Sequence, residues 1–229
     1  MLSGDYYYLM SSLILLLALA IGAVLFPTQR RAMLVSGLLS APFALASVLF
    51  VPEYWRPKRI AVFLAGPEDL LFSFAGGGLV WLAATGLVRP HPTVSLRAGR
   101  VARRYLTLTV TFFLMVLACK YVLGLTTMMG VFISGGLHWV ALLTIRPDLL
   151  RFSATTGLGY SFAYTLFCIL VFAVWPGFSN QWNWGNLIGL TIAGVPIEES
   201  IWALVFAACW ALGMGYAFEV RLPDKADSI

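Results

Sequence analysis

Two pairs of adjacent acidic residues, each close behind a proline, are the residues of this sequence best suited to chemistry. The pairs are Glu68 with Asp69, after Pro67, and Glu198 with Glu199, after Pro196. Two neighbouring carboxyl groups can share one proton, so a single site can supply both a general acid and a general base. Helix capping is the alternative, because proline suits the first turn of a helix and acids there meet free N–H groups. Capping explains one acid per helix better than two copies of an adjacent pair, so we favour a functional site.

The acid pairs stand in two segments that resemble each other, residues 54–75 and 182–206. Each segment begins with aromatic residues and runs through an apolar stretch that contains Ala-Gly. It then reaches the proline and the two acids. This similarity predicts an internal duplication of the chain, with one acid pair in each copy.

The composition places these segments in a membrane. Of the 229 residues, 60% are hydrophobic and 11% are charged, and the mean hydropathy is +0.87. A soluble globular domain carries about 25% charged residues, so a soluble surface cannot be built from what remains. Intrinsic disorder requires low hydrophobicity and is excluded. The three cysteines lie in apolar stretches, which excludes a secreted disulfide scaffold.

Seven transmembrane helices are predicted from the uncharged runs, because a helix needs about 20 apolar residues to cross the hydrocarbon core. The expected spans are residues 6–29, 32–52, 70–88, two helices within 105–145 that turn near 124–130, then 152–175 and 200–218. The polar and aromatic stretch after residue 175 is expected to be a loop at the membrane interface. The predicted fold class is therefore all-α, a polytopic membrane protein.

The predicted architecture is two parallel three-helix repeats joined by a linker helix. The first repeat is residues 1–104, the linker helix is 105–126, and the second repeat with a short tail is 127–229. Parallel repeats put both acid pairs at the same depth, near one face of the membrane. Basic residues concentrate on the connections at the other face, which the positive-inside rule makes cytoplasmic. We expect a multi-pass cell-membrane protein with its N-terminus outside and its C-terminus in the cytoplasm.

With these motifs the sequence resembles the membrane-integral lycopene cyclase domain of carotenoid biosynthesis, in its fused form of two related three-helix units. That family carries a Pro-x-Glu-Glu/Asp motif in each unit. Residues 196–199 (PIEE) match the motif fully. Residues 66–69 (GPED) keep both acids but have the proline one position late.

The resemblance implies an isomerase, of the intramolecular lyase class, that forms a ring at the ψ end group of lycopene or a related linear carotenoid. A proton adds to the end-group double bond, a neighbouring double bond attacks the resulting cation, and loss of a proton completes the ring. This reaction involves no net redox change, and we expect no cofactor and no metal. The sequence shows neither a dinucleotide fingerprint nor metal-ligand spacing. Ring type, carotenoid chain length and the number of ends cyclised stay open.

The resemblance and the chemistry together assign the site residues. An aromatic face one helical turn after an acid is suited to stabilising a cation, although ordinary packing explains such an aromatic equally well. The catalytic candidates are Glu198 and Glu199 first, then Glu68 and Asp69, and the substrate-binding candidates are Trp202, Phe72, Pro196 and Pro67.

The expected partners are a lipophilic carotenoid drawn from the bilayer and the membrane lipids themselves. No nucleic acid is expected, because membrane insertion and anionic lipid explain the net charge of +5. A homo-oligomer, or association with other carotenoid enzymes, stays open.

Several further residues receive structural interpretations. Lys120, inside a span, is expected to reach the outer headgroups, and His138 to bond to a neighbouring helix or line a cavity. Arg56, Lys58 and Arg59 either pair with the first acid motif or bind phospholipid. The aromatic residues on the outer side are interpreted as an interfacial belt: Tyr6, Tyr7, Tyr8, Tyr54, Trp55, Trp182 and Trp184.

Two other functions fit the same architecture. A small transporter with a three-plus-one-plus-three arrangement predicts a polar path near mid-membrane, whereas the acids here stand at helix starts and the mid-span positions are mostly apolar. A non-catalytic membrane subunit predicts that the acids contribute to stability alone.

Overall fold

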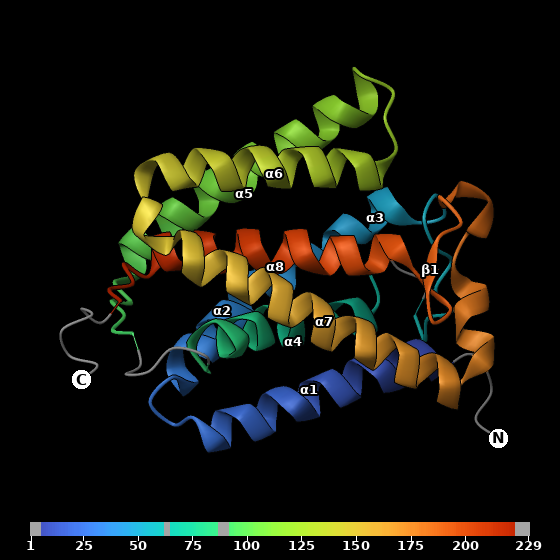
Figure 1. The fold of residues 1–229 in the computed structure, drawn as a ribbon, viewed down its shortest axis with the longest axis horizontal. Helices are drawn as coiled ribbons and strands as arrows, with labels where there is room; N and C mark the ends of the chain where they lie inside the picture. The colour runs from blue at the N-terminus through green and yellow to red at the C-terminus, as the bar shows by residue number, and fades with distance from the viewer. Residues whose placement is uncertain (1–5, 62–64, 87–91, 223–229) are drawn as a thin grey trace.

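Long helices dominate the chain in a computed structural model, which describes residues 6–61, 65–86 and 92–222 (Figure 1). Seven helical spans among those residues are long and apolar enough to cross a membrane. They are α1 (Tyr7–Leu25), the rod α2–η2–α3 (Arg30–Ser40, Ala41–Ala46, Ser47–Phe50), α4 (Pro67–Gly86), α5 (Ala98–Tyr121), α6 (Thr127–Ile145), η3–α7 (Pro147–Leu149, Leu150–Val174) and α8 (Ile197–Ala217). The predicted class, an all-α polytopic membrane protein with seven spans, is confirmed.

The segment between α7 and α8 contains more structure than the loop expected there. It forms two 3-10 helices, η4 (Pro176–Gln181) and η5 (Trp184–Asn186), and a hairpin of β1 (Thr191–Ile192) with β2 (Val195–Pro196). The two turn residues, Ala193 and Gly194, have φ values of 49° and 86°. Positive φ at both positions is typical of a type I′ turn, which matches the twist of a two-residue hairpin.

Helix α5 begins at Ala98 rather than near residue 105, where the uncharged run begins. Counting only uncharged residues left out the arginines of its first two turns, but arginine is a good helix former. Arg100 and Arg104 lie on this extension, and both form ion pairs with Glu219, just beyond the end of α8. The extension therefore ties the start of α5 to the end of α8.

The second span packs closely on α4 through small residues. A methyl group added at Gly77 would lie 2.3 Å from Cβ of Ser40, and one added at Gly37 would lie 2.7 Å from the backbone oxygen of Phe74. Just after this contact along the chain, Pro42 lacks the N–H that a regular helix needs, and the rod continues as the 3-10 segment η2. The N-terminal half of the rod is thus held against α4, while its C-terminal half lines the interior described below.

Helices α4 and α8 form the centre of the bundle and carry the two acid pairs at their first turns. About half of each is buried, whereas α5 is mostly exposed. Helix α4 packs against α1 and α2, and α8 packs against α6 and α7. The two helices run in the same direction (Figure 1). This correspondence agrees with the expected duplication; the repeat and the domain boundaries stay predictions.

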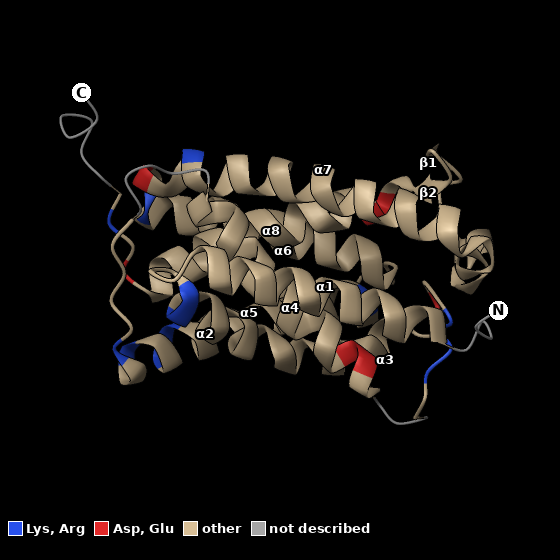
Figure 2. Ribbon diagram, turned by 90° about the horizontal axis from the view of Figure 1, so that it is seen from below, with Lys and Arg blue, Asp and Glu red and all other residues tan. Residues whose placement is uncertain are grey.

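The charged residues gather at the two ends of the bundle, and the acids that open α4 and α8 lie toward the same end (Figure 2). Most of the lysines and arginines drawn in that view lie at the opposite end, where α8 ends. The long apolar middle is what seven membrane spans require. Which face is cytoplasmic stays a prediction.

Candidate functional site

All four acids of the two motifs are buried inside the protein. Their exposed fractions are 0% for Glu68, 4% for Asp69, 5% for Glu198 and 6% for Glu199. A buried carboxyl group is costly unless it is hydrogen-bonded, paired or neutralised. The partners of each acid therefore indicate its role.

The first acid of each pair binds the backbone of the segment that precedes its own helix. Glu68 accepts a hydrogen bond from the N–H of Ile60 at 2.6 Å, and Glu198 accepts one from the N–H of Ile188, also at 2.6 Å. The second oxygen of each has no hydrogen-bond partner among the described residues. A methyl group added at Gly66 would lie 2.5 Å from this second oxygen of Glu68, so the glycine makes room for the acid.

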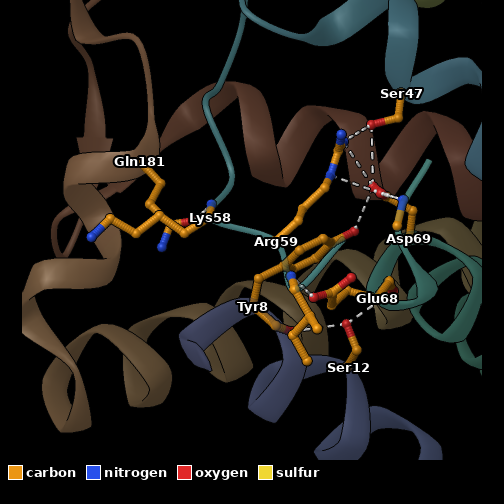
Figure 3. A network of polar contacts seen from close by, with 10 residues as sticks. Tyr8, Ser12, Ser47, Lys58, Arg59, Glu68, Asp69 and Gln181 are labelled. Atoms are coloured by element: carbon orange, nitrogen blue, oxygen red, sulfur yellow. Dashed lines mark hydrogen bonds and ion pairs between the residues drawn. The ribbon is translucent and has the colours of Figure 1, made fainter. Parts of the chain in front are cut away.

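Asp69, the second acid of the first pair, is held by charged and backbone donors. Arg59 forms an ion pair with it, with 2.9 Å between Nε and Oδ2, and the N–H of Gly66 donates to Oδ2 at 2.7 Å. The hydroxyls of Tyr8 and Ser47 donate to Oδ1 at 3.0 and 3.1 Å. Figure 3 shows the side chains of Arg59, Tyr8 and Ser47 converging on Asp69. Arg59 is a permanent cation and the Gly66 N–H can only donate, so both partners are matched to a carboxylate acceptor.

Glu199, the second acid of the second pair, has only neutral partners. The Tyr54 hydroxyl and the Trp182 indole N–H donate to Oε1, each at 2.8 Å, and the Tyr164 hydroxyl donates to Oε2 at 3.0 Å. Among the described residues no cation forms an ion pair with it. Hydroxyl groups can turn to accept a hydrogen bond, so this site accommodates Glu199 in either protonation state.

The position of the proline explains part of this difference. In the first motif the residue before the helix is Gly66, and its N–H caps Asp69 in the manner of a capping box. In the second motif Pro196 itself precedes the helix and has no N–H to give. The capping interpretation is thus correct for part of the Asp69 environment. Glu199 has no such backbone donor at the start of its helix, and side chains donate hydrogen bonds to it instead.

Asp69 and Glu199 line one cavity of about 140 Å³, which we call the carboxyl cavity. Among the described residues, its wall includes neither Glu68 nor Glu198. Phe72 and Trp202 line it as well, and their ring centroids lie 5.9 Å apart. The chain therefore brings one acid and one aromatic residue from each predicted repeat to a shared apolar space.

The two predicted repeats are joined directly at this site. Trp55 pairs with Trp182 in an isolated antiparallel β-bridge, and the N–H of Asn183 donates to the backbone oxygen of Tyr54 at 2.9 Å. Tyr54, from the first half, then donates to Glu199 of the second half. Burial first, and the nearby Glu199 carboxyl next, raise the pKa of Tyr54 well above its usual value, so Tyr54 stays a neutral donor.

Several donors at the site were interpreted from sequence as interfacial aromatics. Tyr8, Tyr54 and Trp182 are buried, with exposed fractions of 4%, 7% and 7%, and each binds an acid. The belt interpretation is wrong for these three, since their polar atoms point inward. Sequence reasoning also missed Tyr164 and Ser47, for which the single sequence carries no signal.

The remaining sequence predictions have mixed outcomes. Of the three outer basic residues, Arg59 pairs with the first acid motif. Lys120 forms an ion pair with Glu53 and donates a hydrogen bond to Thr127 at 2.6 Å; its contact with the headgroups stays a prediction. His138 bonds to Thr111 of α5 at 2.9 Å, so the expected contact with a neighbouring helix is confirmed, and it also lines a cavity.

The prolines expected at the substrate site lie beside it. Pro67 is the first residue of α4, and Pro196 immediately precedes α8. Neither belongs to the wall of the carboxyl cavity as far as the described residues define it. No group of three or more His, Cys, Asp or Glu in residues 6–61, 65–86 and 92–222 could hold a metal ion.

Comparison with known proteins gives a family match within the second half of the chain. Residues 125–217 match the family model of lycopene cyclase. The match covers α6, α7 and α8, and with them Tyr164, Trp182 and Glu199. It does not extend to Tyr54 or Asp69. No curated protein and no solved structure matches the chain.

Proposed function

We propose, on the premise that residues 125–217 are a lycopene cyclase domain, that this chain closes a ring at an end of a linear carotenoid. The family match supports carotenoid cyclisation in general. Our proposal adds the reaction: an isomerisation that is initiated by a proton at the ψ end group and involves no net redox change. The carboxyl cavity is where we place it.

The observation that carries the proposal is the contrast between the two acids of the carboxyl cavity. Asp69 forms an ion pair with Arg59, which is a permanent cation. Within the part of the chain that the structure describes, the donors to Glu199 are all neutral, and two of them are rotatable hydroxyls. A site that holds one carboxylate and one carboxyl able to carry a proton has both elements that cyclisation needs.

The reaction then follows a closed proton cycle. Glu199 donates its proton to the end-group double bond and leaves a carbocation on the substrate. The π electrons of a neighbouring double bond attack this cation and form the ring bond, which moves the positive charge into the ring. Loss of a ring proton to the Glu199 carboxylate forms the final double bond and restores the acid. The product is an isomer of the substrate, and no electrons are gained or lost.

The surrounding residues stabilise the charges that arise during this cycle. Tyr54, Tyr164 and Trp182 donate to the Glu199 carboxylate after it has lost its proton. The Asp69 carboxylate lies in the wall of the same cavity and favours a nearby cation. Phe72 and Trp202 supply aromatic faces, which attract a cation without reacting with it.

The apolar surroundings favour this function over a transporter. A transporter for a hydrated solute needs a polar path near the midplane. Here the cavity that continues from the acids toward mid-bundle has no charged residue in its described wall. A hydrophobic substrate fits this space, and the family match points to the same class.

The proposal is tested by expressing the full chain in bacteria that accumulate lycopene and analysing the pigments by chromatography and mass spectrometry. We expect a product of unchanged mass whose absorption lies at shorter wavelength than that of lycopene, as a ring formed without redox change requires. Glu199→Gln should lose this product, and Glu219→Gln, at the opposite end of the bundle, should keep it. Unchanged lycopene with a well-inserted wild-type protein would contradict the proposed function.

A further inference from the structure

A second cavity, of about 180 Å³, continues from the carboxyl cavity into the bundle. We call it the chain channel. The two cavities share six wall residues: Phe43, Ala46, Phe50, Phe72, Ser73 and Trp202. A ligand whose end lies between Asp69 and Glu199 can therefore extend directly into the chain channel.

The chain channel is elongated along the helices. Its wall follows α8 from Trp202 to Met214, and at 1.5 Å per residue this distance is about 18 Å. The opposite wall follows α5 from Val116 back to Tyr105. The channel thus runs through more than half of a hydrocarbon core of about 30 Å, in the direction of the membrane normal.

An aromatic strip forms the α8 side of the channel. Trp202, Phe206 and Trp210 are spaced at successive turns and all line it. The ring centroids of the first two lie 5.2 Å apart with an interplanar angle of 4°, and those of the last two lie 6.0 Å apart at 24°. Nearly parallel rings over two turns offer a continuous π surface, which suits a long, flat, unsaturated chain.

The wall offers nothing that would hold a charged headgroup. Within the described residues it contains no Lys, Arg, Asp or Glu. His138 is the one imidazole in it, and both of its ring nitrogens are already engaged, with Thr111 and with the backbone oxygen of Ser134. An apolar chain without a polar head is the chemistry that this wall matches.

We propose that the chain channel binds the conjugated chain of the substrate, while the reacting end group occupies the carboxyl cavity. This inference rests on the proposed function for the identity of the ligand. It assigns the orientation: the substrate lies along α8 with its reacting end at the start of the helix. It also assigns the selectivity, because the aromatic strip favours a conjugated chain over a saturated one.

The test measures binding rather than turnover. Lycopene is titrated into the purified full-length Glu199→Gln protein in lipid–detergent micelles, and quenching of tryptophan fluorescence reports binding. In this background Ala46→Phe puts a ring where the two cavities join, and we expect affinity to fall about tenfold or more because the chain no longer fits. Leu45→Phe is the matched control, since Leu45 is its neighbour on η2 and is 60% exposed; it should bind like the parent.

A second matched pair tests the other end of the channel, and keeps the test decisive if Ala46→Phe does not fold. Thr109 lines the channel, whereas its neighbour Val110 is 54% exposed. Thr109→Phe should weaken lycopene binding about tenfold, and Val110→Phe should not. Unchanged affinity in a folded Ala46→Phe or Thr109→Phe protein would overturn the proposed channel.

The aromatic strip is tested with Phe206→Leu, which keeps an apolar side chain and removes one ring. We expect weaker binding of lycopene and little change for a fully saturated hydrocarbon of the same carbon skeleton; equal competition by the two ligands in the parent protein would overturn the selectivity. The two proposals can fail separately. If the wild type cyclises lycopene while the plugged variants, Ala46→Phe and Thr109→Phe, bind it normally, the proposed channel is wrong and the proposed function stands. If the plugged variants lose binding but the wild type forms no ring, the function is wrong and the channel stands.

Discussion

At the scale of single residues, the two members of each acid pair have different partners, because neighbouring side chains leave a helix in different directions. Successive residues on a helix point about 100° apart, so adjacent acids can face different surroundings. Glu68 and Glu198 take the backbone N–H of the preceding segment. Asp69 and Glu199 face the carboxyl cavity. The first acid of each pair thus binds the backbone before its helix, and the second lies in the wall of the cavity.

The structural task of the first acid is tested at Glu198. Glu198→Ala leaves the N–H of Ile188 without its acceptor, and we expect a loss of about 1–3 kcal/mol of stability. Glu198→Gln keeps an oxygen in place for the same hydrogen bond and should unfold close to the wild-type temperature. Thermal unfolding of the two purified variants makes the comparison; equal destabilisation by both would show that the charge, not the acceptor, is what matters.

The donors around Glu199 give a second residue-scale prediction. Tyr164→Phe removes one hydrogen bond to a carboxylate that is charged in mid-reaction, and such bonds contribute about 1.5–3 kcal/mol. We expect the cyclisation rate to fall roughly tenfold to a hundredfold, with substrate binding largely kept. Tyr160→Phe is the control, because the Tyr160 ring stacks on Tyr164 with centroids 6.1 Å apart. A loss of rate in Tyr160→Phe as large as that in Tyr164→Phe would contradict the account.

The sequence identified the acids but not the residues that distinguish them. The partners of Glu199 come from positions far along the chain, 35 residues away for Tyr164 and 145 for Tyr54. A single sequence shows only that an aromatic residue lies near the end of a span. An interfacial belt residue and a buried hydrogen-bond donor both fit that pattern. For the first motif, the sequence offered Arg56, Lys58 and Arg59 without deciding between pairing with the acids and binding phospholipid, and it is Arg59 that forms the ion pair.

At the scale of elements, small residues determine how closely the second span approaches α4. Gly77→Ala would place a methyl group 2.3 Å from Cβ of Ser40 and 2.9 Å from the backbone oxygen of Ser36. Backbone cannot move aside cheaply, so we expect a loss of about 1–3 kcal/mol. Gly136→Ala on α6, where no atom lies within 4 Å of the added methyl group, should be neutral. Unfolding temperatures of the two variants decide, and equal values would contradict close packing at Gly77.

The ion pair between Glu53 and Lys120 ties the end of α3 to the turn between α5 and α6 and gives a pH prediction. Burial opposes the charged form of Glu53, but hydrogen bonds from Lys120 and Thr127 outweigh it and lower its pKa. A lowered pKa means that the stabilisation is present above the ordinary carboxyl pKa and is lost as pH falls through the folded-state pKa. The wild type should therefore unfold at a higher temperature than Glu53→Gln at pH 7. This difference should shrink below about pH 4.5, and a difference that persists at low pH would contradict it.

The elements themselves were largely predictable, for a physical reason. Long uncharged runs have few alternatives to membrane-spanning helices, so all seven spans appear where hydropathy puts them. The errors lie where charge or polarity was used as a boundary: α5 extends through its arginines to Ala98, and the polar segment before α8 folds into 3-10 turns and a hairpin. Those features depend on tertiary partners, such as Glu219 for Arg100.

At the scale of the whole molecule, the arrangement places the acid pairs at one end and most basic residues at the other (Figure 2). The positive-inside rule then predicts that the acids lie toward the outer face. Arg56 and Arg103 are both exposed, on the two sides of this prediction. In intact cells a membrane-impermeant maleimide should label Arg56→Cys, and should label Arg103→Cys only after permeabilisation. The reverse pattern would contradict the orientation.

The duplication expected from sequence has a functional consequence at this scale. Each predicted repeat contributes one acid to the carboxyl cavity, and Tyr54 of the first repeat binds Glu199 of the second. The sequence predicted two equivalent motifs. It could not show that their partners differ, with Arg59 at Asp69 and neutral donors at Glu199. The two halves thus contribute acids with unlike partners to one cavity.

The central claim is that Glu199, not its neighbour, carries the proton for ring closure. The most direct measurement is the rate of lycopene cyclisation by purified Glu199→Gln and Glu198→Gln, side by side with the wild type. Loss of a general acid costs about a hundredfold to ten-thousandfold in rate, so Glu199→Gln should fall by that factor. Glu198→Gln should stay within about tenfold of the wild type, because it keeps the backbone acceptor. Full activity in Glu199→Gln, or equal loss in both variants, would contradict the account.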